Sequence, residues 1–348
     1  PLLGMNASTK SSRQSSPSRP PLSLQRRSPA YFSKRYQTLL SNLKKHSAGG
    51  KEHSIRHASC SFIQQVGKKL GFPQTTISTA QALYHRFYLF YSVRDYPPQD
   101  ISITAIFVAS KIEETIKKLR DIFVVIHSVR HPDSKELDPE QVSEDRRKRI
   151  IGYEKVMLET LCFDFQIRHP YEIMVKFVKY INAHQSIDGR VLARRAYMLL
   201  TDSYKTPLCL EYPAHSIAAG AIWLANRLLK DEDDSFTGLD ESRPWDLVFR
   251  TRMEDMEDVC HQILDLYIQI CPDEEMHRYT RIKIQLNQEL QSRGADRYLQ
   301  GHPDPEGLGS SVVSDKQIVY SNSTLDMANT NQHTVCYQFV SMSPHDIQ

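Results

Sequence analysis

The sequence predicts an all-α protein with two tandem five-helix repeats and disordered N- and C-terminal tails. First, apolar residues recur at helical spacing, almost without interruption, from about residue 55 to residue 270. Second, each half contains one segment that is apolar on every side, as expected of a helix that is buried on every side. Third, the second half repeats residues of the first at a constant offset, which indicates an internal duplication.

Residues 1–50 form a basic leader that we expect to be mostly disordered. They contain nine Lys or Arg residues and no Asp or Glu, and the first thirty are rich in Ser, Pro and Arg. Ser16 and Ser28 each precede a proline and are candidate sites of proline-directed phosphorylation. A short basic helix is predicted over Tyr31–His46. The nine positive charges of the leader exceed the net charge of the whole chain, which is +3, so the residues after the leader are mildly acidic as a group.

The first repeat is predicted to occupy residues 51–168. Its third helix begins at Pro97 and Pro98, which suit a first helical turn, and continues as an apolar run that ends in the charged sequence Lys111-Ile112-Glu113-Glu114. We interpret this segment as the buried centre of the repeat. The helices expected in this repeat cover residues 55–70, 77–91, 97–115, 117–129 and 144–163.

The second repeat is predicted to occupy residues 169–271. The sequence PPQDISITAIFVASK from Pro97 matches PAHSIAAGAIWLANR from Pro213 at an offset of 116, so Lys111 corresponds to Arg227. In the last helix of each repeat, Glu154 corresponds to Glu257 at an offset of 103. The second copy is therefore shorter between its central helix and its last helix.

Residues 272–348 are predicted to be an extension that is partly helical and then disordered. Met276–Arg293 has the composition of a charged helix, and hydrophobicity falls beyond it. Ser343 precedes a proline and is a third candidate phosphorylation site.

The sequence contains none of the patterns that we would expect of an enzyme, a metal site or a cofactor site. It has no P-loop, no HExxH motif and no CxxC pair, and its six cysteines are scattered, as in proteins of a reducing compartment. His127 and His131 have helical i, i+4 spacing, but no third ligand accompanies them. No apolar run approaches the roughly 20 residues of a membrane span. We therefore expect an interaction protein without catalytic residues, metal or cofactor, and with no membrane partner.

Several motifs resemble the cyclin family over about residues 53–270. They are ASKIEE at the end of the first central helix and YEKVMLETLCFDF in the fifth helix. FIQQVGKKLG, YHRFYLF and EDVCHQILDLY resemble the transcriptional cyclins, the group that includes cyclin K and the fungal beta subunit of the RNA polymerase II C-terminal domain kinase. The resemblance implies two cyclin-box repeats, a nuclear location and a cyclin-dependent kinase of the transcriptional class as partner, with or without a third subunit.

The resemblance also implies a function and a binding site. The chain is expected to activate a kinase that phosphorylates the C-terminal domain of RNA polymerase II and so promotes transcription elongation. Lys111 and Glu154 match the residues with which cyclins hold the mobile helix of the kinase. Phe107 and Ile112 are expected beside them, together with Glu113 and Glu114 of the motif, whereas Phe123 and Leu158 are assigned to the core. The alternative is that Lys111 and Glu154 form only an internal ion pair that braces the repeat.

The sequence differs from the cell-cycle cyclins at two places, and two functions other than kinase activation are alternatives. His85 replaces an aspartate of the cell-cycle cyclins, and residues 55–59 lack the Met and Leu of their substrate-docking patch, so that mode of recruitment is not expected. A factor IIB-like DNA-binding protein is one alternative, but it would need a zinc ribbon, and no cysteine precedes Cys60. A helical scaffold without a kinase is the other. Nucleic-acid binding is expected only weakly, through the basic leader.

Overall fold

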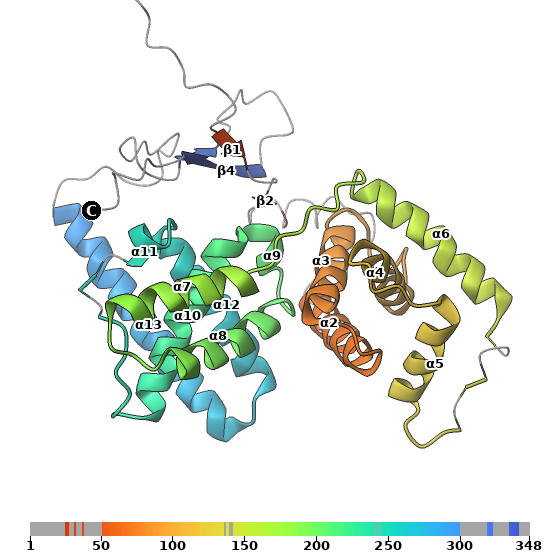
Figure 1. Ribbon diagram of the computed structural model, residues 1–348, viewed down its shortest axis with the longest axis horizontal. Helices are drawn as coiled ribbons and strands as arrows, with labels where there is room; N and C mark the ends of the chain where they lie inside the picture. Colours follow the sequence, from red (N-terminus) through yellow and green to blue (C-terminus); the bar gives the residue numbers. More distant parts are fainter. Residues whose placement is uncertain are drawn as a thin grey trace, which may run out of the picture.

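Two helical repeats lie side by side in the computed structural model, with a small sheet beside them (Figure 1). The structure describes residues 25–27, 31–32, 37, 51–135, 137–138, 142–240, 242–243, 245–299, 319–322 and 334–340. The candidate phosphorylation sites Ser16, Ser28 and Ser343 lie outside these residues.

The first repeat surrounds its central helix with the other four. Its helices are α2 (Glu52–Lys69), α3 (Gln74–Phe90), α4 (Pro98–Ile112), α5 (Leu119–Arg130) and α6 (Glu144–Thr160). Helix α4 packs against α2, α3, α5 and α6, and it buries Ile101, Ile103 and Ile106 almost completely. Because apolar residues face every side of this helix, it is stable only when its neighbours enclose it. The prediction of a buried central helix is thus confirmed.

The second repeat has the same plan with one short additional helix. Its helices are α7 (Tyr171–His184), α8 (Gly189–Ser203), α9 (Leu208–Glu211), α10 (Ala214–Glu232), α11 (Trp245–Val248) and α12 (Met253–Ile270). Helix α10 is central and packs against α7, α8 and α12. A Cβ at Gly220 would lie 2.7 Å from Cβ of Val259, so the glycine permits the close approach of α12. The offset of 116 relates the first residues of the two central helices, Pro98 and Ala214.

The two repeats have separate hydrophobic cores. The core of the first repeat runs from Cys60 to Leu161, and that of the second includes buried residues from Tyr171 onward, together with Ala82 of α3. The predicted boundary at residues 168 and 169 falls between Leu161 and Tyr171 and stays a prediction. The second core extends beyond residue 271, because Tyr279, Ile282 and Leu286 of α13 belong to it. Helix α13 spans Asp273–Leu299, a longer segment than the predicted Met276–Arg293.

Helix α6 ends three residues before the predicted position. Its last residue is Thr160, and the chain then turns through Cys162 and Phe163, whose φ angles are 49° and 56°. Left-handed backbone at two successive non-glycine residues cannot continue a right-handed helix. The helical spacing of apolar residues gave no sign of this turn, because Phe163 continues the pattern although its side chain is exposed.

Four short strands form an antiparallel sheet from the two flanking segments. Strand β4 (Thr334–Val340) pairs with β1 (Gln25–Arg27), β2 (Tyr31–Phe32) and β3 (Val319–Asn322). The alternation of β-branched and aromatic residues in TVCYQFV suits a strand, a signal that the sequence analysis did not use. The helix predicted over Tyr31–His46 is wrong at its start, because β2 occupies its first two residues. The expected disorder of the remaining flanking residues falls outside the described residues.

A buried histidine links the two repeats. His85 of α3 is completely buried, and its Nε2 lies 2.9 Å from the carbonyl oxygen of Tyr204 at the end of α8. Arg56 lies 3.3 Å from the Nδ1 atom of His85 and can only donate, so Nδ1 accepts and Nε2 carries the proton. Burial, reinforced by the Arg56 guanidinium, lowers the pKa of His85 to about 3. A neutral imidazole is thus the form that fits the seam between the repeats.

A second histidine extends this polar seam toward the end of α4. Thr79 donates to Oε1 of Glu113 at 2.6 Å, so its oxygen accepts from Nε2 of His169 at 2.8 Å. Nδ1 of His169 then accepts from the Tyr204 hydroxyl at 2.7 Å. Burial lowers the pKa of His169 to about 4, which keeps the ring neutral in this role. The chain of bonds connects α8 of the second repeat to Glu113, two residues beyond Lys111.

The two buried histidines predict acid-sensitive folding. Since their folded pKa values lie below the unfolded value of about 6.5, they favour the folded state above pH 6.5, and this stability is lost as the pH falls toward 4. We expect the free energy of unfolding, measured with urea, to fall between pH 7 and pH 5. A His85→Gln variant, which can still accept and donate, should show a smaller fall. The exposed control His277→Gln should match the parent chain, and an equal slope in all three would contradict this assignment.

Candidate functional site

An ion pair stands at the exposed end of the central helix of the first repeat. Nζ of Lys111, in the last turn of α4, lies 2.6 Å from Oε1 of Glu154 on α6. The Lys111 side chain is 42% exposed and that of Glu154 is 15% exposed. The last turn of a helix favours a cation because the carbonyl end of the helix dipole is negative. The structure thus brings together the two residues that the resemblance singled out.

Phe107 fixes the position of this ammonium group from a second direction. It lies one turn before Lys111, and the Lys111 Nζ is 4.0 Å from the centroid of the Phe107 ring. The attraction between a cation and an aromatic face adds to the ion pair. The Lys111 ammonium contacts a carboxylate and the face of a ring, so it is held in one place while the side chain remains accessible to solvent.

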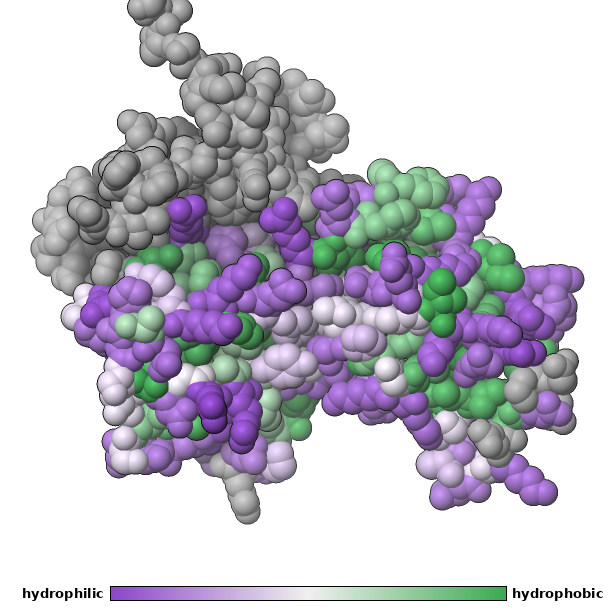
Figure 2. Space-filling view, viewed as in Figure 1, coloured by the Kyte–Doolittle hydropathy of each residue, from purple (hydrophilic) through white to green (hydrophobic). Residues whose placement is uncertain are grey.

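Apolar side chains surround the pair. Ile112 and Leu158 are partly buried against the core of the first repeat, and Ile151, one turn before Glu154, is 54% exposed. In Figure 2, apolar residues lie among hydrophilic ones at the end of the molecule that carries α5 and α6. The core side of α6 is filled by Ile150 and Met157, which leaves the side chain of Ile151 exposed. Ile151 therefore adds an exposed apolar group to the helix that carries Glu154.

The two glutamates of the ASKIEE motif do not take part in the ion pair of its lysine. Glu113 accepts from Thr79 and belongs to the seam between the repeats. Glu114 is exposed and has a φ of 55°, so it ends the helix in the left-handed region. Phe123 is buried in the core of the first repeat, where the guanidinium of Arg146 covers its ring at 4.9 Å. The surface around the ion pair therefore consists of Phe107, Ile112, Ile151 and Leu158.

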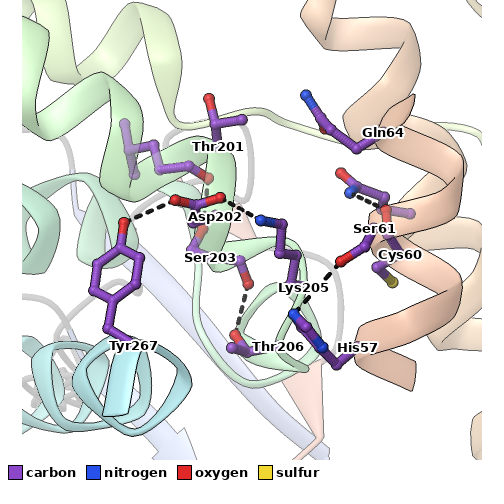
Figure 3. Close-up of polar contacts among 12 residues, drawn as sticks. His57, Cys60, Ser61, Gln64, Thr201, Asp202, Ser203, Lys205, Thr206 and Tyr267 are labelled. Carbon is purple, nitrogen blue, oxygen red and sulfur yellow. Dashed lines mark hydrogen bonds and ion pairs between the residues drawn. The ribbon is translucent and has the colours of Figure 1, made fainter. Parts of the chain in front are cut away.

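The segment that corresponds to the cell-cycle docking patch is polar in this chain (Figure 3). His57 and Ser61 of α2 lie 3.4 Å apart, from Nε2 to Oγ, and face Lys205 at the end of α8. Lys205 is paired with Asp202 at 2.7 Å, and Tyr267 donates to the same carboxylate at 2.8 Å. Burial and then Lys205 lower the pKa of His57. The residues described at this surface therefore contact one another through hydrogen bonds and an ion pair.

The other histidine and cysteine side chains of the described residues bear on two kinds of chemistry, a metal site and a reactive thiol. Within the part of the chain that the structure describes, no group of three or more His, Cys, Asp and Glu side chains is arranged to hold a metal ion. The rings of His127 and His131 lie 5.0 Å apart without such a group. Burial raises the pKa of the Cys260 thiol to about 12, so it is protonated at neutral pH. No helix among the described residues has the length and apolar character needed to cross a membrane.

Comparison with known proteins shows the family to which the chain belongs. The family model described as "Cyclin, N-terminal domain" matches residues 29–166. A putative cyclin-T1-1 of Arabidopsis thaliana is 31% identical over 214 residues, which cover 62% of this chain and 83% of that protein. This chain belongs to the cyclin family. The CTD kinase subunit beta of Schizosaccharomyces pombe is 37% identical to this cyclin over 211 residues, which cover 60% of each chain.

Other relatives are much longer than the matched region. Cyclin-K of Homo sapiens is 31% identical over 242 residues, which cover 69% of this cyclin but 40% of the relative. The cyclin spans between 40% and 60% of the length of several of the curated relatives that it matches. A chain in the crystal structure of the yeast RNA Pol II CTD kinase CTDK-1 complex superposes with a TM-score of 0.58 at 22% identity, covering 74% of this cyclin and 83% of that chain. This likeness shows that the two share a fold.

The comparison connects this cyclin with a relative that is named as a subunit of a kinase. It does not decide whether Lys111 and Glu154 face a partner or only brace the repeat. The geometry bears on this question, because an ion pair with a lysine that is 42% exposed adds little to folding.

We therefore expect Lys111→Ala to lower the free energy of unfolding by less than about 1 kcal/mol, as is typical of exposed pairs. Urea denaturation followed by circular dichroism would measure the change. Ile106→Ala, in the buried part of the same helix, is the positive control and should cost about 2–5 kcal/mol. A cost near that of the control for Lys111→Ala would favour the internal brace.

Proposed function

We propose that this cyclin binds and activates a cyclin-dependent kinase of the transcriptional class, which phosphorylates the C-terminal domain of RNA polymerase II in the nucleus and promotes elongation. The observation that carries the proposal is the fixed ion pair within an apolar surface at the end of α4. The similarity to the CTD kinase subunit beta and to cyclin-K supports the transcriptional class. The polymerase substrate, the nuclear location and a third subunit are parts of the same proposal.

The ion pair can hold the backbone of another protein. A lysine ammonium has three N–H donors, and Glu154 takes one of them, so the others can reach carbonyl groups of a partner. The second carboxylate oxygen of Glu154 can accept from a partner N–H. Once Phe107, Ile112 and Ile151 exclude water, these charge-assisted bonds become stronger than they are in solution.

Activation follows from preferential binding to one conformation of the kinase. A kinase is active when its mobile helix is placed so that the catalytic Lys–Glu pair and the metal sites are complete. A cyclin surface that fits only this position of the helix shifts the population toward it, by as much as the difference in binding free energy. The rigid placement of Lys111 by Glu154 and Phe107 supports such selectivity, because the site loses little entropy on binding.

The test compares two charge variants. Lys111→Glu places two carboxylates together at the centre of the surface, and we expect the affinity for the kinase to fall at least about 30-fold, since an unpaired buried charge costs about 2–5 kcal/mol. The exchange Lys111→Glu with Glu154→Lys restores an internal ion pair but not its donors, and it should remain defective. Lys176→Glu, an exposed change of the same charge on α7, is the control.

Two measurements are needed, namely kinase binding by titration calorimetry and phosphorylation of a peptide with the polymerase heptad repeat. Full rescue by the charge exchange would show that the pair is a brace and would contradict the proposed contact. Retention of affinity by both variants would favour a scaffold that uses another surface. Binding without phosphorylation of the heptad peptide would preserve the kinase partner and exclude this substrate.

A further inference from the structure

The second repeat contains counterparts of the residues around the ion pair. At the offset of 116, Phe107, Lys111 and Ile112 of α4 correspond to Trp223, Arg227 and Leu228 of α10. Glu154 of α6 corresponds to Glu257 of α12 at the offset of 103. The stacking is repeated as well, because Arg227 covers the Trp223 ring at 5.4 Å as Lys111 covers Phe107 at 4.0 Å. Each repeat thus has a cation at the end of its central helix, packed on an aromatic ring one turn earlier.

The two faces differ in what covers them. Lys111 is 42% exposed, whereas the side chain of its counterpart Arg227 is 15% exposed. Trp223, Leu228 and Glu257 are buried. The surface around Arg227 therefore has the same kinds of residue as the surface around Lys111, but other residues of this chain cover it.

Helix α13 is the occupant. Glu289 of α13 accepts from Arg227 through both oxygens, with distances of 2.6 Å from Nη1 and 2.8 Å from Nη2. A bidentate pair between a guanidinium and a carboxylate fixes distance and direction together. Arg278 of α13 donates to the carbonyl oxygen of Leu228 at 2.8 Å and to Asp231 at 3.1 Å, so it binds the last turns of α10.

The apolar contacts of α13 have the pattern of a helix bound in a groove. Ile282 and Leu286 are 1% exposed and lie one turn apart, and Glu289 follows three residues later on the same side. Tyr279 precedes them on this side and is also buried. The opposite side carries exposed residues, including Ile284 and Gln288. Helix α13 therefore contacts the second repeat through an apolar stripe, which Arg281 and Lys283 flank with ion pairs to Asp231 of α10 and Asp265 of α12.

We propose that the second repeat retains a helix-binding face equivalent to the docking face of the first, and that α13 is its built-in ligand. The equivalence rests on the proposed role of the Lys111 surface in kinase binding, but the contact with α13 can be measured without any kinase. The face recognises an amphipathic helix with two apolar residues four apart, followed after three residues by a carboxylate. Because α13 fills this face, the kinase has only the face of the first repeat available.

The first test uses amide hydrogen exchange in the full chain. Arg227→Glu and Glu289→Arg each remove the bidentate pair, and we expect the amides of α13 to exchange at least tenfold faster while those of α10 and α12 keep their protection. The double variant, Arg227→Glu with Glu289→Arg, should recover protection because it restores opposite charges. Gln288→Arg, on the exposed side of α13, should leave exchange unchanged.

The second test supplies the ligand in trans. A fluorescein-labelled peptide of residues 273–299 should bind the full-length Glu289→Arg chain saturably, and the same peptide with Glu289→Arg should bind that chain at least tenfold more weakly. Faster exchange of α10 and α12 in step with α13 would show a single cooperative unit and overturn the proposal, as would failure of the peptide to bind. Neither result depends on kinase activation, and Lys111→Glu should leave both measurements unchanged.

Discussion

The burial of α4 and α10 on every side constrains the rest of this cyclin. A helix with apolar residues all round cannot lie at a surface, so each repeat must enclose its central helix with other helices. Only the end of such a helix can reach solvent, and that end carries a cation in both repeats, Lys111 and Arg227. The position of the functional surface therefore follows from the packing of the core. The surroundings of the two cations differ, because Lys111 is exposed whereas Arg227 is covered by α13.

The seam between the repeats reaches this surface through hydrogen bonds. Tyr204, His169, Thr79 and Glu113 form a continuous chain from the second repeat to the end of α4, and His85 adds a parallel link. Both histidines must be neutral for the donors and acceptors to match. The relative placement of the repeats and the termination of α4 thus depend on the same buried groups. This explains why Glu113, although it belongs to the motif, faces the seam and not the solvent.

The sequence predicted the repeats and the ion pair but not the details of the surface. Periodicity located the helices to within a few residues, and the duplication related Lys111 to Arg227, since both signals arise from burial, which a sequence pattern records directly. The exposure of Ile151 cannot be predicted from the sequence, because an apolar residue next to a buried one cannot be assigned to core or surface until the neighbouring helices are placed. The contact of Glu289 with Arg227 was missed for a related reason, since no periodicity specifies which distant helix covers a face. The sheet of the flanking segments depends on pairing between the two ends of the chain, which local patterns do not report.

The most direct test of the central claim is a hydrogen-exchange footprint of the full cyclin with and without its purified kinase. We expect binding to slow the exchange of amides in residues 105–112 and 150–158, on either side of the Lys111–Glu154 pair, and to leave α10 and α13 unchanged. Protection confined to the second repeat, or to the polar surface around His57 and Lys205, would contradict the account. In that case the ion pair would be an internal brace, and the kinase would bind elsewhere.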